Sequence, residues 1–566
     1  KNLKIAIHKD SALLPAYNVL AELYYRNALP DSALLFAKQS LALNTYNPYG
    51  NYITGLILAQ KGQTDDAIGA FSWAARSPEY SSAANTKIAE LYLKEANYNR
   101  ASEFAQRALE NNPLNIEAMQ LLAMLHRLQD DEIKADSMLN RIYSVDKLNH
   151  FARFEQYLLN PKQKTLEDFR HLIRNELPAE TYLRLAAFYL DAGRQQDAIT
   201  LLRQTNNQNH AIIKLWLAYL TRDESPGQSK KYLDDALTSS PAFIFPHRTQ
   251  TLEILNWARE QTDNWVPNYY LGLIYWHKQQ PDLARKIFNE LGNRPDYGPF
   301  YIMRAELNKS SANDSGSIRK DLTRALDLSP ESWRSWHALN TYYVAHGQLD
   351  ELLDNAEQAY QKFPKQDAIK MGYAQALLLN GNYEQCVTHL NTIRVLPFEG
   401  AQAGRVLQEQ AHLLAAIHAI ESQEYKKGLK FIDDSRDWPE HLGVGQPYNP
   451  DLRLQDLLSA IVYKLDGRSK KAKPFYLNIR NYTKQYPSKT RTQYLAHALA
   501  AYVMGDTAKA DELMDAWLEA DPDNPLRIAL HSQYKDGKPS TQINEMQYVQ
   551  LRLLSHLVKL AKTAGQ

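Results

Sequence analysis

The chain has 566 residues and a nearly balanced charge, with 65 Lys and Arg residues against 64 Asp and Glu residues. This balance gives no reason to expect a surface for nucleic acid or for an anionic membrane, and no stretch approaches the ~18 consecutive apolar residues of a membrane-spanning helix. The single cysteine excludes a framework of internal disulfides and leaves the redox compartment open. The length is too great for one hydrophobic core, yet no break in composition separates globular domains. A repeat array resolves this conflict, because its core grows in one dimension.

Small residues recur every 34 positions in the first part of the chain, at Ala33, Ala67, Ala101 and Ala135. This is the period of the tetratricopeptide repeat, in which two antiparallel helices are joined by a tight turn. We therefore predict regular repeats over residues 1–148, each helix pair contacting only its neighbours. Counting back from Ala33 places the start of the chain inside the second helix of an incomplete repeat. We expect the chain to be the C-terminal part of a longer protein.

The repeat register slips over residues 149–262, where we expect irregular and shortened helix pairs, and it returns over residues 263–394. The clearest match to the repeat pattern places Gly272, Ala284 and Phe288 at their characteristic positions. Small residues let the two helices of a pair approach closely, while aromatic side chains fill the gap towards the next pair. Cys386 occupies a small-residue position, so we interpret it as a buried small hydrophobe. No companion His and acid support a nucleophile there.

Two steps of the repeat are longer than 34 residues after Cys386, and they place two loops among the helix pairs of residues 395–540. Prolines and glycines make the loops at residues 396–405 and 438–451 fixed, non-helical excursions. Such insertions map to one face of a repeat array, often the functional face. Residues 541–566 are predicted to form a C-terminal helix that caps the stack. The predicted fold is all-α, a tetratricopeptide-like right-handed superhelix of about fifteen antiparallel helix pairs.

The two loops hold the candidate functional residues. Glu399 and Glu440 are the one carboxylate pair that we nominate for acid/base chemistry, and ion pairing with Arg405 or Arg453 explains them as well. The segment at residues 443–445 is not a phosphate-binding loop, because no strand precedes it and no Gly-Lys-Ser/Thr follows. The histidines lack metal-ligand spacing. We therefore expect neither a metal nor a cofactor.

The same loops carry a family resemblance. Residues 438–448 read WPEHLGVGQPY and residues 397–401 read PFEGA. They resemble the C-terminal repeat region of the bacterial DUF5107 proteins, where a segment close to W/Y-P-E-N-L-G-V-G-K-P-Y recurs. This chain departs from that segment at His441 and Gln446, and the specific match covers residues 396–456.

The resemblance implies a larger bacterial protein. Its N-terminal half would be a β-sandwich related to galactose mutarotase that docks on the repeats, with carbohydrate as the substrate class. The positions that carry over as ligand or domain interface are Phe398, Glu399, Arg405, Trp438, Glu440, His441, Leu442, Gly443, Gly445 and Tyr448.

Two functions stay open. The first is a non-enzymatic scaffold that binds a protein partner or its own N-terminal domain. The second is the helical half of a carbohydrate-active enzyme, in which Glu399 and Glu440 flank a glycosidic bond. Neither hypothesis involves nucleic acid or a membrane span. The compartment is undecided, with the cytoplasm preferred over the periplasm.

Overall fold

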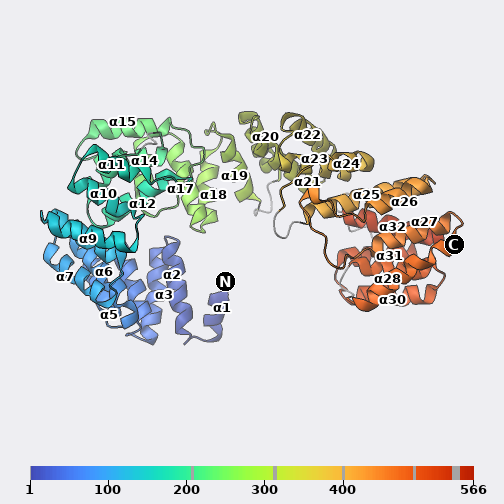
Figure 1. Cartoon of the computed structure of the whole chain (residues 1–566), viewed down its shortest axis with the longest axis horizontal. Coiled ribbons are helices and arrows are strands. Elements are labelled where there is room, and N and C mark those ends of the chain that lie inside the picture. The colour runs from blue at the N-terminus through green and yellow to red at the C-terminus, as the bar shows by residue number, and fades with distance from the viewer. Residues whose placement is uncertain (1, 206–208, 310–314, 398–401, 489–491, 538–548) are drawn as a thin grey trace. The chain divides into compact units, whose positions relative to one another are not determined.

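The computed structural model describes every residue except 1, 206–208, 310–314, 398–401, 489–491 and 538–548 (Figure 1). Every regular element among the described residues is a helix, which confirms the all-α, tetratricopeptide-like prediction. The helices form two compact units, Lys1–Pro295 (unit 1) and Asp296–Gln566 (unit 2). No helix in the described ranges is both long and apolar enough to cross a bilayer.

Unit 1 contains helices α1 to α18, most of which pack in sequential antiparallel pairs. Their bounds are α1 Asn2–Lys9, α2 Leu14–Arg26, α3 Pro30–Leu43, α4 Pro48–Gln60, α5 Thr64–Ala74, α6 Pro78–Lys94, α7 Tyr98–Asn111, α8 Ile116–Leu128, α9 Glu132–Val145, α10 His150–Leu159, α11 Gln163–His171, α12 Pro178–Asp191, α13 Gln195–Arg203, α14 Ala211–Thr221, α15 Pro226–Leu237, α16 Gln250–Gln261, α17 Val266–His277 and α18 Pro281–Leu291.

Unit 2 contains helices α19 to α32 and three short 3-10 helices. Their bounds are α19 Gly298–Asn308, α20 Ser315–Leu328, α21 Trp333–Ala345, α22 Leu349–Lys362, α23 Asp367–Leu379, α24 Tyr383–Leu390, α25 Ala403–Glu421, α26 Tyr425–Asp434, η1 Glu440–Leu442, α27 Arg453–Leu465, η2 Ser469–Lys471, α28 Lys473–Gln485, η3 Thr492–Tyr494, α29 Leu495–Val503, α30 Thr507–Glu519, α31 Pro525–Asp536 and α32 Val549–Gly565.

The small residues of the repeat lie at the closest points between paired helices. Ala33, Ala67 and Ala101 are fully buried. A Cβ atom added to Gly272 in α17 would lie 2.1 Å from Cε1 of Phe288 in α18. Because this separation is far below a van der Waals contact, only glycine fits there against the phenylalanine ring. The sequence pattern therefore reports the packing of each pair directly.

Unit 1 closes on itself. Lys278 Nζ, after α17, donates to the carbonyl oxygen of Arg26 at 3.1 Å, and Gln280 Nε2 donates to that of Asn27 at 2.7 Å. These partners, here named the closing contact, lie 252 and 253 residues apart in sequence. The expectation that each pair contacts only its neighbours is therefore wrong for unit 1. Its helix pairs curve strongly enough for the α17–α18 turn to reach the C-terminus of α2, where a cation is favoured by the helix dipole.

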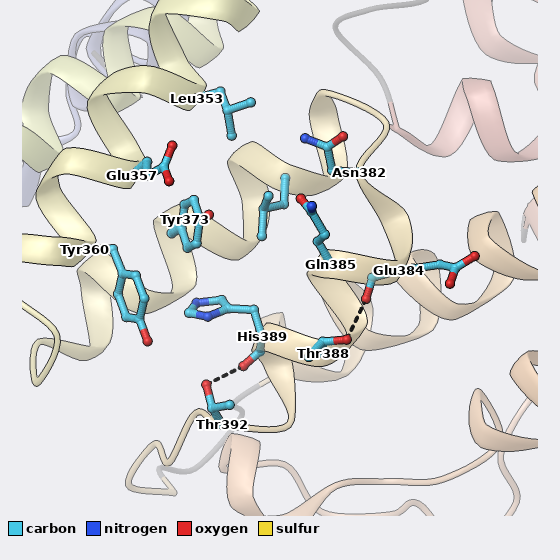
Figure 2. Close-up of a pocket in the computed structure, with 11 residues that line it drawn as sticks. Leu353, Glu357, Tyr360, Tyr373, Asn382, Glu384, Gln385, Thr388, His389 and Thr392 are labelled. Atoms are coloured by element: carbon cyan, nitrogen blue, oxygen red, sulfur yellow. Dashed lines mark hydrogen bonds between the residues drawn. The ribbon is translucent and has the colours of Figure 1, made fainter.

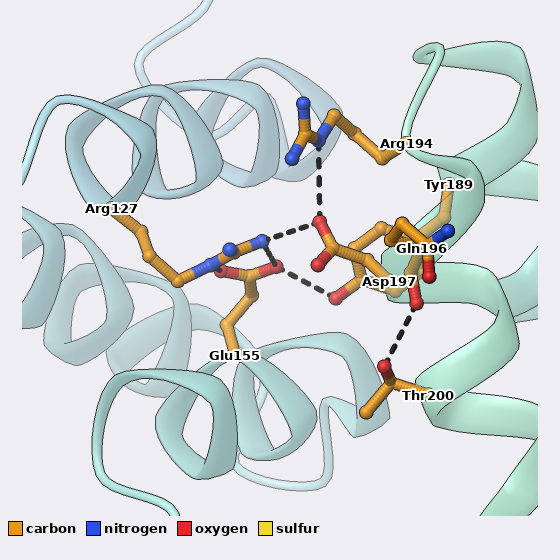
Figure 3. A network of polar contacts seen from close by, with 7 residues as sticks. All are labelled: Arg127, Glu155, Tyr189, Arg194, Gln196, Asp197 and Thr200. Carbon is orange, nitrogen blue, oxygen red and sulfur yellow. Dashed lines mark hydrogen bonds and ion pairs between the residues drawn. The ribbon is translucent and has the colours of Figure 1, made fainter.

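A buried ionic network joins four helices of unit 1 (Figure 3). Glu155 in α10 is fully buried and accepts hydrogen bonds from Arg127 Nε at 2.6 Å, Arg127 Nη2 at 3.0 Å and Tyr189 Oη at 2.7 Å. Arg127 Nη2 also donates to Asp197 at 2.9 Å, and Arg194 Nε donates to Asp197 at 3.3 Å. Each charge of the network therefore has an opposite charge beside it, which is the condition for burying ions.

Candidate functional site

Arg405 and Trp438, two of the predicted interface residues, form a packed pair. The Arg405 guanidinium carbon lies 4.0 Å from the centroid of the Trp438 ring. Arg405 Nη1 donates to the Ser435 carbonyl oxygen at 2.7 Å and to Gln408 Oε1 at 2.5 Å. The Arg405 side chain is buried by these contacts, so its observed interactions hold the end of α26 against α25.

The second loop packs against the residues that enter the first loop. Val395 N donates to the His441 carbonyl oxygen at 2.9 Å. Gly443 has φ +72° and lies so close to residues 395–397 that an added Cβ would be 3.2 Å from the Leu396 carbonyl oxygen. Leu442 is buried, and an added Cβ at Gly404 would lie 2.7 Å from its carbonyl oxygen. The glycines therefore permit a close junction of backbone segments.

The remaining predicted residues are either exposed or outside the described part of the chain. Phe398 and Glu399 lie outside the described residues, so the proposed pair of Glu399 with Glu440 stays a prediction. Glu440 and Gly445 are exposed, and Tyr448 is 97% exposed.

The two arginines considered as partners of the glutamates have other carboxylate partners. Arg405 Nη2 lies 3.3 Å from Glu409 Oε1, and Arg453 Nη2 lies 2.6 Å from Asp451 Oδ2. Burial raises the pKa of the Glu409 carboxyl group, an effect that the nearby Arg405 opposes. Over the described part of the chain, neither arginine pairs with Glu440, so that alternative is wrong for Glu440 and stays a prediction for Glu399.

A pocket of about 660 Å³ lies elsewhere in unit 2, between α22 and α24 and over α23 (Figure 2). We name it the tyrosine pocket. Its lining residues come from the three consecutive helices α22, α23 and α24 and from the residues that flank α24. They are Leu353, Glu357, Tyr360, Tyr373, Leu377, Asn382, Glu384, Gln385, Thr388, His389 and Thr392.

Three aromatic rings form one wall of the tyrosine pocket. The Tyr360 and Tyr373 rings stack with centroids 5.2 Å apart and planes inclined by 12°. The His389 ring stands edge-on to both, with centroids at 4.7 Å and 5.0 Å. His389 Nε2 donates to the Lys370 carbonyl oxygen at 3.0 Å. Burial lowers the pKa of His389, so the ring is held neutral and contributes no positive charge at neutral pH.

The charged groups that line the tyrosine pocket are carboxylates. Glu384 Oε1 pairs with Lys427 Nζ at 2.6 Å. Glu357 is exposed and makes no salt bridge within the described ranges. The pKa of the Tyr373 hydroxyl is raised first by burial and then by Glu357, which shows that this carboxylate acts on the pocket wall. A carboxylate beside aromatic faces, such as Glu357 here, is a setting that attracts a cation.

Sequence reasoning did not find the tyrosine pocket, because tyrosines at such spacings were assigned to the repeat core. The available signal was the short helix α24, which has eight residues where α22, the second helix of the preceding pair, has fourteen. Cys386, also in α24, is buried as predicted, and burial raises its thiol pKa to about 12. Its Sγ–H donates to the Ala374 carbonyl oxygen at 3.2 Å. Across the described residues, no group of His, Cys, Asp and Glu side chains is arranged to hold a metal ion.

The chain is similar to several solved structures and, over one segment, to a family model. None of the curated proteins matches the chain. Among solved structures, it is similar to the APC/C hetero-tetramer Cut9–Hcn1, at 14% identity over 100% of this chain and 99% of that chain with a TM-score of 0.25. It is similar to Naa15/Naa10 bound to HypK-THB, at 14% identity over 94% and 92% with a TM-score of 0.28. It is also similar to YrrB, described as a TPR protein with an unusual peptide-binding site, at 18% identity over 32% and 98% with a TM-score of 0.26.

At these TM-scores the likenesses carry no argument about function. The family model of the tetratricopeptide repeat matches residues 343–394, the segment that includes α22, α23 and α24. Together with the paired helices, this match supports a tetratricopeptide-repeat region that contains the tyrosine pocket.

Proposed function

We propose that this chain is a protein-interaction scaffold and that the tyrosine pocket holds a basic side chain of a partner's peptide. The observation that supports this most is the composition of the pocket. Two stacked tyrosine rings lie beside Glu357, a carboxylate free of salt bridges within the described chain. A guanidinium or ammonium group gains from both a ring face and a carboxylate.

The rest of the pocket suits a peptide backbone. Asn382 and Gln385 line the pocket with amide groups, and Leu353 and Leu377 line it with apolar side chains. Sites that combine an apolar lining with a few polar groups bind extended ligands with defined orientation. Docking of an upstream domain of the same protein, which the DUF5107 resemblance implies, would be one case of this function and stays a prediction.

The test compares two charge reversals on the same helix of the full chain. Glu357→Lys places a cation at the tyrosine pocket, and Asp354→Lys makes the same change at an exposed residue outside its lining. Peptides selected from a displayed random library on the unmodified chain should share an Arg or Lys. Glu357→Lys should weaken their binding about five- to tenfold, as expected when an exposed ion pair becomes a repulsion, while Asp354→Lys should leave it unchanged.

Selection without a basic residue, or equal binding by both variants, would exclude the tyrosine pocket as the site. If the unmodified chain retains neither a peptide nor a cellular protein, the scaffold function itself is wrong. Titration by fluorescence anisotropy provides the affinities.

A further inference from the structure

The connection between α15 and α16 displays two phenylalanine rings on the surface of unit 1. Phe243 is 76% exposed and Phe245 is 58% exposed. Ile244 and Pro246, which alternate with them, are buried, and residues 244–248 form no helix, turn or bend. Such alternation is typical of an extended segment, because successive side chains point to opposite faces. Ile244 and Pro246 therefore anchor the segment and leave both rings on its other face.

The segment is held at both of its ends. Phe243 has φ +61°, in the left-handed region that a bulky side chain rarely adopts. Backbone strain of this kind persists where the surrounding structure fixes it. At the other end, Arg248 Nη2 donates to the Glu180 carbonyl oxygen at 3.1 Å and to Glu180 Oε2 at 2.6 Å, at the start of α12. These contacts fix the position of the segment that carries the exposed rings.

A cavity of about 600 Å³ lies beside this segment. Both phenylalanines line it, together with Leu177, Pro178 and Ala179 at the start of α12. Leu177 is itself 53% exposed. Three large apolar side chains, each more than half exposed, thus line one cavity, and exposed apolar groups gathered at a cavity mark a site of interaction. We name the cavity and residues 243–247 beside it the phenylalanine site.

The backbone of the phenylalanine site has hydrogen-bonding groups without a protein partner. Within the described residues, the N–H groups of Phe245 and His247 have no acceptor, and the Phe245 carbonyl oxygen meets only His247 Nδ1, at 3.4 Å. Residues two apart in an extended segment place these groups on the same edge, and Pro246, which lacks an N–H group, falls between them. An edge of this kind can pair with the backbone of another extended chain.

The charges at the phenylalanine site indicate which side chain of a partner complements it. Glu180 is paired with Arg248. Glu176 also lines the cavity, is exposed and makes no salt bridge within the described ranges. Burial lowers the pKa values of the lining residues His210 and His277, so both imidazoles are neutral at neutral pH. The carboxylate of Glu176 is therefore left for a lysine or arginine of a partner.

We propose that the phenylalanine site binds an extended segment of a partner protein. The segment adds its backbone to the edge at Phe245 and His247, places a large apolar side chain in the cavity and directs a lysine or arginine to Glu176. Addition of a strand to an exposed edge, with pockets for alternate side chains, is a recurrent mode of peptide recognition. This inference rests on the proposed scaffold function and adds a binding surface in unit 1, made of other residues than the tyrosine pocket.

The test uses the full chain with Glu357→Lys, in which the tyrosine pocket is blocked. Peptides selected on this chain from a displayed random library should share apolar residues at alternate positions and a Lys or Arg. Phe245→Ala should weaken their binding at least about tenfold, because it removes a ring from the site. Ile133→Ala, which changes an 85% exposed apolar residue of α9 outside the site, should leave binding unchanged. Glu176→Lys should weaken binding about five- to tenfold.

Methylation of the peptide's own backbone nitrogens tests the strand pairing. A paired strand uses the N–H groups of every second residue. Methyl groups on one alternating set of nitrogens should therefore weaken binding at least about tenfold, and methyl groups on the other set should have a much smaller effect. Fluorescence anisotropy with labelled peptides provides the affinities.

Three results would overturn the proposal. They are equal binding by the Phe245→Ala and Ile133→Ala chains, equal effects of the two methylation sets, and a loss of helical circular dichroism in Phe245→Ala, which would assign the ring to folding. Binders on the unmodified chain and none on Glu357→Lys would also exclude the phenylalanine site while keeping the tyrosine pocket. That outcome is distinguishable from a lack of binders on both chains, which would refute the scaffold function itself.

Discussion

Glu155→Gln should destabilise unit 1 by about 2–4 kcal/mol. The side chain is fully buried and accepts three hydrogen bonds, two from Arg127 and one from Tyr189. Removing one partner of a buried ion pair costs about 3–5 kcal/mol, because the other charge is left without compensation. Asp197, whose carboxylate is 2.9 Å from Arg127 Nη2, retains part of that compensation. The N–H group of the glutamine amide would also face the hydrogen-bond donors of Arg127 and Tyr189.

The coupling free energy between Glu155 and Arg127 is a more specific test of the network than either single variant. Arg127→Met alone should cost about 3–5 kcal/mol, since it leaves the Glu155 carboxyl group buried without its main partner. In the double variant the two losses overlap, so its cost should fall below the sum of the single variants by about 2–3 kcal/mol. The free energy of unfolding should be measured from hydrogen exchange of the α10 and α12 amides against urea, because that readout belongs to unit 1 alone.

Glu103→Gln is the matched control, because Glu103 pairs with Arg107 at 2.6 Å on the surface, with 41% and 51% of the two side chains exposed. Exposed pairs of this kind contribute about 0–1 kcal/mol. A change below about 0.5 kcal/mol for Glu155→Gln, or strictly additive single variants, would refute the view that the network stabilises unit 1.

Two further predictions concern packing and pH. Gly272→Ala should lower the stability of unit 1 by about 1–3 kcal/mol, because its Cβ would overlap Phe288. Gly69→Ala is the control: it lies in the interior of α5 with open space at the Cβ position and should raise the stability by about 0.5–1 kcal/mol. Thermal unfolding compares the two variants, and equal effects would contradict the packing argument. His497 has its pKa lowered from 6.5 to about 4, first by burial and then by Arg453. Because the unfolded chain binds this proton more tightly, stability should be full above pH 6.5 and should fall by at most about 3 kcal/mol as the pH drops towards 4, with the loss reduced by solvent screening at this partly exposed side chain. His497→Gln should flatten that part of the urea-midpoint profile, and an unchanged slope would exclude this group as its source.

The repeat architecture could be predicted from the sequence because it depends on local geometry. The spacing of Ala33 and Ala67, and of Gly272 and Phe288, reflects contacts between helices that are adjacent in the chain. Cys386 was also interpreted correctly, since a small residue at a repeat position is buried by the pair itself.

The sites could be predicted less well because they depend on contacts that the repeat does not encode. The loop residues Arg405 and Trp438 are predicted as ligand or domain-interface residues, and this stays a prediction; in the structure they contact each other, and Arg405 also contacts the end of α26. Tyr360 and Tyr373 look like core residues in the sequence. They line a pocket in the structure because the neighbouring helix α24 is short. An amphipathic pattern over α32 predicts a buried face but does not say which helices cover it.

The closing contact changes how unit 1 would respond to a pulling force. An open array of helix pairs extends under a low force, because each pair can tilt against the next without breaking a bond. In unit 1, the hydrogen bonds of Lys278 and Gln280 to the end of α2 link helices near the two ends of the array. Under a pulling force, unit 1 should therefore resist until a threshold force breaks the closing contact. Above that force, it should extend easily. Gln280→Ala should lower that threshold in optical-trap measurements while leaving the later extension unchanged.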